Sequence, residues 1–478
     1  MKTVFAILFL VAVIPLILRR KPFTWHLVAR KYPKVISESA VFMRIHNIIS
    51  LVWAAVYALS FLLAYSGGFI RPFMIIPFGI LASVLMPGYI LKRTGSPVKF
   101  KTLKEAFEAM PYSVNRKAAA GVDVVVQFDL SGKEAQISHM VIKDSKCSLC
   151  NAPHSNPTLT IKADSGLWLA IINKETDNTK AFLEGRLVLE GDISVIRKFS
   201  AIFSRQEIKR NKPRVQDYNY KTLKPGRIKN IVVIDGGARS GKYSKTTLMA
   251  DKFTEGAESA GAKVEKFVLR ELGINECVGC YTCWTKTPGT CIIKDPMNEL
   301  LMKYREADLI VFASPLYVFN VTAHLKVFMD RSLPLLVPYM KENPEGQIVH
   351  PGRYPESDKQ GFVVFSAAGF PDIDGNFDGL KGMFRAWDKH HEGAGMLGEF
   401  YLPAAEMLSV PIFSDRKAIV EKACFDAGVQ AVNEGRIDFR HMSAITDIMM
   451  DSDEFMRQAN IFWSTLDGGK SYMSAVKG

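Results

Sequence analysis

From residue 229 onward, short runs of consecutive apolar residues alternate with longer stretches of helical spacing, and this alternation constrains the fold more than any other feature. The apolar runs cover residues 231–234, 264–269, 309–313, 362–366 and 398–402, and helices are expected near residues 245–260, 297–305 and 322–333. Strands that are apolar at every position belong to a parallel sheet covered on both faces. We therefore predict an α/β doubly wound parallel sheet, whose ligands bind at the carboxyl ends of the strands.

The first of these strands ends in a glycine-rich loop that opens the following helix. Free backbone N–H groups and the helix dipole at such a point favour a phosphate. The loop also fits seven positions of the Walker A pattern, but Tyr243 stands where that pattern needs a Ser or Thr to hold magnesium, which argues against an NTPase. The candidate phosphate-binding residues are Gly237, Ala238, Arg239, Ser244 and Thr246.

Two further strand ends suit a flat ring. A rigid proline and an aromatic residue follow the third strand, where they can support a planar group. Small residues end the fourth strand and let the backbone approach a ring edge. The candidate ring-binding residues are Ser314, Pro315, Leu316, Tyr317 and Val318 after the third strand, and Ser366, Ala367 and Gly369 after the fourth.

These segments carry a resemblance to a known family. The stretches GGARSGKYSKT, SPLYVFNVTAHLKVFMDR and SAAGF resemble the NADPH-dependent FMN reductases, and CVGCYTCWTKTPGTCIIKD is similar to a segment of iron–sulfur flavoproteins within the flavodoxin-like branch. The resemblance implies a flavodoxin-like fold that binds FMN, with the phosphate on the first loop and the ring between the other two, and NAD(P)H as hydride donor. Gly237 departs from the family, which usually has Ser there.

Four cysteines within fifteen positions form a C-x2-C-x2-C-x7-C pattern. Two-residue gaps let successive thiolates converge on one centre, and four thiolates suit a [4Fe-4S] cluster or zinc. The last gap is wider than in the ferredoxin pattern, so packing or thiol redox chemistry without a metal stays an alternative. The candidate metal ligands are Cys277, Cys280, Cys283 and Cys291.

Residues 100–205 indicate a small α+β domain. The even-numbered positions of residues 122–128 are all apolar, which is typical of a strand with one face on a core. The stretches VVVQFDLSGKEA and NPTLTIKADSGLWLAIINKETDNTKAFLEGRLVLEGD resemble the sterol carrier protein type 2 family, which implies a hydrophobic tunnel for a lipid-like ligand. The alternative is that Trp168, Leu183, Leu187 and Leu189 only fill a core.

Three charge-free apolar runs open the chain, at residues 3–18, 48–65 and 72–91. The second and third are long enough to cross a bilayer, and the first is slightly short; a cleaved signal peptide is its alternative interpretation. Residues 1–104 hold 14 Lys and Arg and one acid, which accounts for the net charge of +13 and disfavours a nucleic-acid partner. Most of these bases flank one side of the runs, so we expect the chain after residue 91 in the cytoplasm.

These features divide the chain into a membrane anchor (1–95), a sterol-carrier-like domain (100–205), a linker (206–227) and a flavodoxin-like domain (228–478). The leading hypothesis is an FMN-dependent NAD(P)H oxidoreductase, anchored to the cell membrane on its cytoplasmic side and acting on an apolar or quinone-like acceptor. The alternatives are a lipid-binding carrier with a regulatory flavin fold and an iron–sulfur flavoprotein electron carrier. Expected partners are the membrane, NAD(P)H, an apolar ligand and a second copy of the chain.

Overall fold

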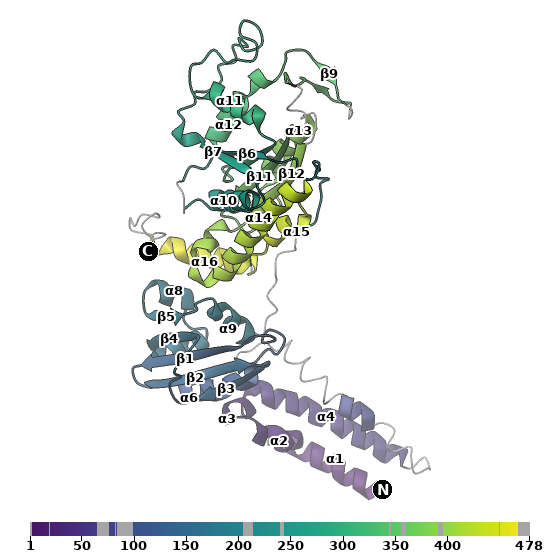
Figure 1. The fold of residues 1–478 in the computed structure, drawn as a ribbon. Helices are drawn as coiled ribbons and strands as arrows, with labels where there is room; N and C mark the ends of the chain where they lie inside the picture. The colour runs from purple at the N-terminus through teal and green to yellow at the C-terminus, as the bar shows by residue number, and fades with distance from the viewer. Residues whose placement is uncertain are drawn as a thin grey trace. The chain divides into compact units, whose positions relative to one another are not determined.

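The computed structural model falls into two compact units, Met1–Gln206 and Glu207–Gly478 (Figure 1). It describes all residues except 1, 19, 65–75, 82, 84–98, 204–213, 240–242, 344–345, 355–359, 391–394, 449 and 467–478.

The second unit is built on a five-stranded sheet in which every neighbouring pair is parallel. The strand order is β12-β11-β8-β6-β7, so the predicted doubly wound parallel sheet is confirmed. The strands are β6 (Asn230–Asp235), β7 (Lys263–Val268), β8 (Leu309–Ala313), β11 (Gly361–Ala367) and β12 (Gly395–Leu402). Each contains or overlaps one of the apolar runs expected from the sequence.

Helices cover both faces of this sheet (Figure 1). One face packs against α10 (Lys245–Ser259) and α14 (Ser414–Glu434), through residues such as Phe253 and Val420. The other face packs against α11 (Met297–Glu306), α12 (Ala323–Asp330) and α13 (Asp378–His390). The remaining elements are the short β9 (Lys341–Glu342) and β10 (Ile348–Val349) and the helices α15 (Phe439–Ala444) and α16 (Ser452–Ser464). With both faces occupied, the edge of the sheet at the strand ends is left for a ligand.

The segment expected to be a linker is attached to this second unit along its described part. The N–H of Lys221 donates to the carbonyl of Met396 at 2.8 Å, and the N–H of Leu223 donates to the carbonyl of Gly435 at 2.8 Å. Arg214 forms an ion pair with Glu399, whose side chain on β12 is fully buried. Residues 214–223 are therefore not an open linker, because contacts with distant parts of the chain hold them in place. Such contacts leave no signal in the local sequence.

The first unit contains a sheet of a different kind, in the order β3-β2-β1-β4-β5. Only β1 and β4 pair in parallel. Trp168 and Leu187 lie in its core, whereas Leu183, expected to fill that core, is 43% exposed. The elements are α6 (Leu103–Ala109), β1 (Val124–Ser131), β2 (Gln136–Lys143), β3 (Lys146–Cys150), β4 (Leu159–Asp164), α7 (Ser165–Ile172), α8 (Asn178–Leu183), β5 (Leu187–Gly191) and α9 (Val195–Phe203).

The N-terminal helices belong to this first unit. Helix α1 (Lys2–Ile17) packs along α4 (Ala40–Leu63), with the short α2 (Phe23–Val28) and α3 (Lys34–Ser37) between them in the chain (Figure 1). Within the described ranges, α4 is the helix whose length and composition allow it to cross a membrane; α1 is apolar but shorter. Helix α4 begins eight residues before the apolar run expected at 48–65, and most of the run at 72–91 lies outside the described residues.

Candidate functional site

The three loops predicted to form a site emerge from β6, β8 and β11, which are consecutive neighbours in the sheet. Since β7 lies on one side of β6 and β8 on the other, the chain changes direction there, and the carboxyl ends of such strands bound a crevice. The loops touch one another as well. The N–H of Gly236 donates to the carbonyl of Ala313 at 2.8 Å, and the N–H of Leu316 donates to the carbonyl of Ala367 at 2.9 Å. The site is therefore one continuous edge.

The first loop is organised by Asp235, a buried carboxylate at the end of β6 that the sequence pattern did not single out. Its Oδ1 accepts the N–H of Gly237 at 2.8 Å, and its Oδ2 accepts the hydroxyl of Thr247 at 3.0 Å. A Cβ at position 237 would lie 2.8 Å from Oδ1. Asp235 thus occupies the space that a serine side chain would need, which explains the glycine at position 237. The N–H of Gly237 is already used by the carboxylate of Asp235.

Donors for an anion remain at the start of α10. Ser244 is its N-cap, and its Oγ accepts the N–H of Thr247 at 3.2 Å. Lys245 is only 8% exposed, and burial lowers its pKa. Arg239, Ser244 and Lys245 place a guanidinium, a hydroxyl and an ammonium near a helix N-terminus, a donor set that fits a phosphate. Thr246, also predicted to bind it, is buried.

Two further residues hold the first loop in place, and neither carried a sequence signal. Arg270, which follows β7, donates from Nη1 to the carbonyls of Gly237 at 3.2 Å and Arg239 at 3.1 Å. Thr322 donates its hydroxyl to the carbonyl of Gly236 at 2.7 Å, while its N–H donates to Ser314 Oγ at 3.0 Å. The first and second loops are therefore fastened to each other through side chains that start from other elements.

The second loop ends in a tight hairpin. Tyr317 and Asn320 exchange both backbone hydrogen bonds, at 2.9 and 3.1 Å. The two residues between them adopt positive φ angles, 48° for Val318 and 63° for Phe319. Left-handed backbone at a β-branched and an aromatic residue is strained and is found where function holds it in place. Val318 is 90% exposed, and Tyr317 and Phe319 are also exposed, so the hairpin presents apolar side chains to solvent.

Helix α13 supports this hairpin from one side. A Cβ at Gly379, in the first turn of the helix, would lie 2.8 Å from the carbonyl oxygen of Phe319. Only glycine lets the helix approach the strained turn so closely. Gly379 was not among the residues expected from the sequence, because the contact joins segments sixty positions apart.

The third loop divides into buried and open parts. Ser366 is fully buried, and its hydroxyl has no hydrogen-bond partner within the part of the chain that the structure describes. Ala367 is buried too, whereas a Cβ at Gly369 would meet nothing within 4 Å and Phe370 is exposed. The open backbone at Gly369 and the apolar side chains of Tyr317, Val318 and Phe370 fit the edge and face of a planar ring.

The cysteine loop lies between β7 and α11. Cys277 and Cys280 are exposed, Cys283 is buried and Cys291 is half-buried. Burial and the neighbouring thiols raise the pKa of Cys283, and hydrogen bonds with Thr282 lower that of Cys280. No three His, Cys, Asp or Glu side chains among the described residues, the four cysteines included, come close enough to hold a metal ion. The four cysteines as metal ligands stay a prediction.

A buried ion pair anchors this loop. Arg331, at the end of α12, donates from Nη1 and Nη2 to the two carboxylate oxygens of Asp295 at 2.8 and 2.9 Å. Its Nη1 also donates to the carbonyl of Asn275 at 2.5 Å. Both ends of the loop are thus tied to one guanidinium.

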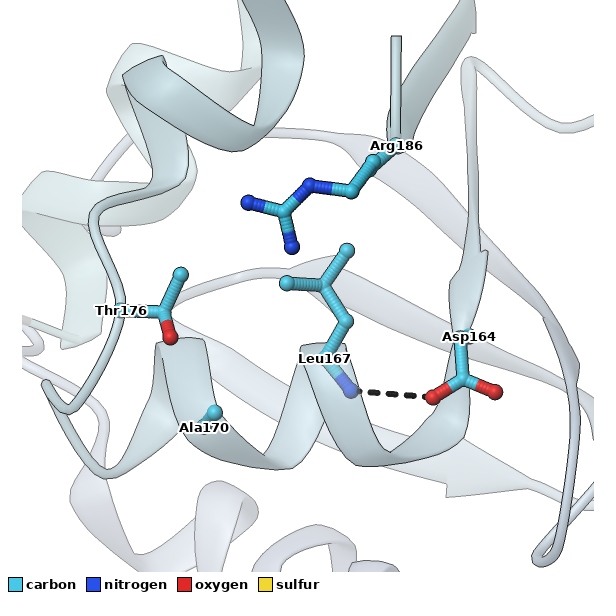
Figure 2. A pocket seen from close by; sticks show the side chains of 5 residues that line it. All are labelled: Asp164, Leu167, Ala170, Thr176 and Arg186. Atoms are coloured by element: carbon cyan, nitrogen blue, oxygen red, sulfur yellow. Dashed lines mark hydrogen bonds between the residues drawn. The ribbon is translucent and has the colours of Figure 1, made fainter. Parts of the chain in front are cut away.

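The first unit contains a separate cavity of about 530 Å³. It lies beside α7, and Figure 2 shows Leu167 and Ala170 on this helix with the guanidinium of Arg186 reaching toward the same space. Asp164 caps the helix and accepts the N–H of Leu167 at 3.2 Å. The residues that line the cavity are Asp164, Leu167, Ala170, Thr176 and Arg186. An apolar floor with a polar rim suits a ligand that has one apolar and one polar end.

Comparison with known proteins confirms both resemblances. Residues 229–351 match the NADPH-dependent FMN reductase family, and residues 101–204 match the SCP-2 sterol transfer family. The chain therefore carries a domain of each kind.

Curated relatives match parts of the chain. An iron-sulfur flavoprotein of Archaeoglobus fulgidus is 42% identical over 93 residues, which make up 20% of this chain and 41% of that protein. An iron-sulfur flavoprotein of Methanocaldococcus jannaschii is 35% identical over 122 residues, or 26% of this chain and 61% of that protein. The chain thus spans less than two thirds of the length of these relatives. A solved azoreductase structure from Bacillus anthracis is 14% identical at a TM-score of 0.33 and covers 43% of this chain and 99% of that one.

Proposed function

We propose that this protein is an FMN-dependent oxidoreductase that uses NAD(P)H and reduces an apolar, quinone-like acceptor. The observation that carries the proposal is the arrangement of the strand-end edge, with cationic and hydroxyl donors on the loop after β6 and exposed apolar side chains on the loops after β8 and β11. This edge matches an amphipathic ligand with a phosphate at one end and a flat ring at the other.

The roles of the chain's residues follow from this placement. Ser244 and Arg239 would bind the phosphate, Arg270 and Thr322 hold the first two loops together, and the hairpin at Tyr317 fixes the side on which a second substrate approaches. The chemistry supplied by bound FMN is the acceptance of a hydride from NAD(P)H and the delivery of electrons to an acceptor. The protein contributes position, charge and an apolar surface.

The first experiment is reconstitution of the full chain in mild detergent with FMN, followed by its absorption spectrum and NAD(P)H oxidation. Bound flavin and oxidation that depends on a short-chain quinone are expected. A protein that stays colourless after reconstitution ends the proposal. Light scattering on the same sample tests the predicted homodimer.

The membrane location is also a proposal. It is supported by the length and composition of α4 and by the concentration of positive charge in residues 1–104. Membrane fractionation, with protease added to right-side-out and inverted vesicles, tests it. We expect the second unit to stay with the membrane and to be cleaved only in inverted vesicles.

A second candidate role concerns the cysteine loop, because the named relatives are iron-sulfur flavoproteins and four thiols share one loop. Anaerobic purification with iron, sulfide and zinc analysis tests whether the loop takes up a cluster. Values near zero for all three would leave thiol chemistry or packing as its role.

For the sterol-carrier-like domain we propose binding of a lipid-like ligand in the cavity beside α7. Replacing Ala170 by Phe places a large ring in this space, whereas the same change at the exposed Ala120 does not. Titration of the full chain with a fluorescent fatty acid is expected to show weaker binding only for Ala170→Phe. Equal binding by both variants would remove the cavity from consideration.

A further inference from the structure

A carboxylate from a fourth loop enters the cationic end of the candidate site. Glu406 lies in the short 3-10 helix Ala405–Ser409, directly after β12. Its Oε1 accepts a hydrogen bond from Arg239 Nη1 at 2.7 Å. Its other oxygen, Oε2, is buried and has no hydrogen-bond partner in the described portion of the chain. A buried acceptor without a donor is costly, so its presence calls for an explanation.

The surroundings of Glu406 are positively charged. Lys245 is buried at the start of α10, and the charges of Glu406, Arg239 and Lys417 act on it. Lys417 also pairs with Glu421 at 3.8 Å, so Arg239 and Lys245 are the cations left to Glu406 at this end of the site. Two cationic side chains beside a single carboxylate are suited to exchange one anion for another.

We propose that Glu406 is an internal counter-ion of the phosphate site, which the phosphate of FMN displaces from Arg239, so that the carboxylate weakens FMN binding and makes the flavin exchangeable. This inference rests on the proposed function, because it concerns the same site. Glu406 acts as an affinity-setting residue and not as a catalytic one.

The competition follows from charge and geometry. An alkyl phosphate carries close to two negative charges at neutral pH and binds guanidinium through the same paired donors as a carboxylate does. Arg239 is already engaged by Glu406, so binding either breaks this ion pair or brings phosphate next to a carboxylate. Both alternatives cost free energy that the site would save if residue 406 were neutral.

The test compares Glu406→Gln with Glu258→Gln in the full chain stripped of flavin. Glutamine keeps the shape of glutamate and removes the charge. Glu258 is exposed near the far end of α10 and serves as the matched control for the change in net charge. Each protein is titrated with FMN and with riboflavin, which lacks the phosphate, and flavin fluorescence gives the dissociation constants.

We expect Glu406→Gln to bind FMN about tenfold more tightly, to release it more slowly, and to bind riboflavin as the unchanged protein does. Unchanged or weaker FMN binding by Glu406→Gln would overturn the inference. So would an equal gain for riboflavin, or an equal gain in Glu258→Gln, because neither depends on the phosphate site. If the unchanged protein and both variants bind no flavin, the proposed function itself fails.

Discussion

The two five-stranded sheets of this chain differ in how far their side chains are buried. Along β8, β11 and β12 every residue is buried, whereas β1 and β2 alternate between buried and more exposed positions. A sheet covered on both faces has no place for unpaired polar groups except at its strand ends, and these ends are where the candidate flavin site lies. The sheet with one covered face has its cavity beside a helix. The position of each site thus follows from the way its sheet is covered.

Glu399 is the exception in the parallel sheet. It is fully buried in the middle of β12, yet it accepts hydrogen bonds from Tyr220 at 3.0 Å and Tyr401 at 2.8 Å. Arg214 and Arg385 form ion pairs with the same carboxylate. A charge can remain on the covered face because the segment before β6 brings Arg214 and Tyr220 to it and α13 brings Arg385.

The largest effect should come from removing this charge. Glu399→Ala leaves two guanidinium groups without their shared carboxylate, and we expect a loss of about 3–5 kcal/mol in the free energy of unfolding. Urea unfolding followed by tryptophan fluorescence measures it. A loss below about 1 kcal/mol would show that the parallel sheet tolerates polar groups on its faces. It would contradict the contrast between the two sheets.

A smaller effect is expected where Asp295, just before α11, pairs with Arg331 at the end of α12. Burial alone would raise the pKa of Asp295, but hydrogen bonds from Arg331 and from the backbone N–H groups of Asn275 and Met297 lower it to about 2. A carboxyl group with a lowered pKa stabilises the fold above its unfolded value near 4, and this contribution of about 2–3 kcal/mol is lost as the pH falls toward 2.

Asp295→Asn should therefore lower stability at pH 7 and flatten its decline between about pH 4 and pH 2. Unfolding measured across this pH range checks the expectation. A variant that declines as steeply as the unchanged protein would contradict it.

The hairpin at the site should be sensitive to the size of the residue at 379. Gly379→Ala should push against the carbonyl of Phe319 and shift the strained turn, which we expect to weaken FMN binding about tenfold. The matched control is Gly382→Ala on the same helix, where a Cβ meets nothing within 4 Å. The control should gain about 0.5–1 kcal/mol of stability from helix propensity and bind FMN unchanged. Flavin titration and thermal unfolding of both variants test this. If Gly379→Ala binds FMN as tightly as Gly382→Ala, Gly379 has no role in the flavin site.

The smallest effect is expected on the more exposed sheet. Glu190, on β5, pairs with Lys162 at 2.8 Å, and both side chains are about half exposed. Glu190→Ala should cost less than about 1 kcal/mol. Compared with Glu399→Ala, this variant shows how strongly the contribution of a strand glutamate to stability depends on whether both faces of its sheet are covered. Similar losses in the two variants would contradict the contrast drawn between the sheets.

The strands of the second unit could be predicted because continuous apolar runs leave a local signal. The expected strand at 309–313 coincides with β8, and the expected helix at 245–260 ends one residue after α10. Helix α13 could also have been predicted, since the apolar residues Leu380 and Phe384 recur at helical spacing. Helix α14 was not, because much of its buried face consists of small residues such as Ala423 and Ala427, which form no clear apolar stripe.

The site was less accessible to sequence reasoning. The loops were found because glycine, proline and small residues mark strand ends. The side chains that organise them were not, since Arg270 and Glu406 reach the first loop from other elements and Arg239 and Glu406 are 167 positions apart. A pairing of this kind exists only once the sheet has brought its strand ends together. The cysteine spacing, in turn, predicted a metal-ligand set, and this stays a prediction.

The contact between Asp235 and Gly237 has an evolutionary consequence. Because a side chain at 237 would collide with the carboxylate at 235, the two positions are epistatic: a serine at 237 is harmful while aspartate is present and becomes acceptable once residue 235 is small. Asp235→Ala combined with Gly237→Ser should therefore be more stable than the sum of the two single changes predicts, which a double-mutant cycle measures. A serine at 237 and an aspartate at 235 are therefore alternatives at this turn, and a change at one position calls for a change at the other.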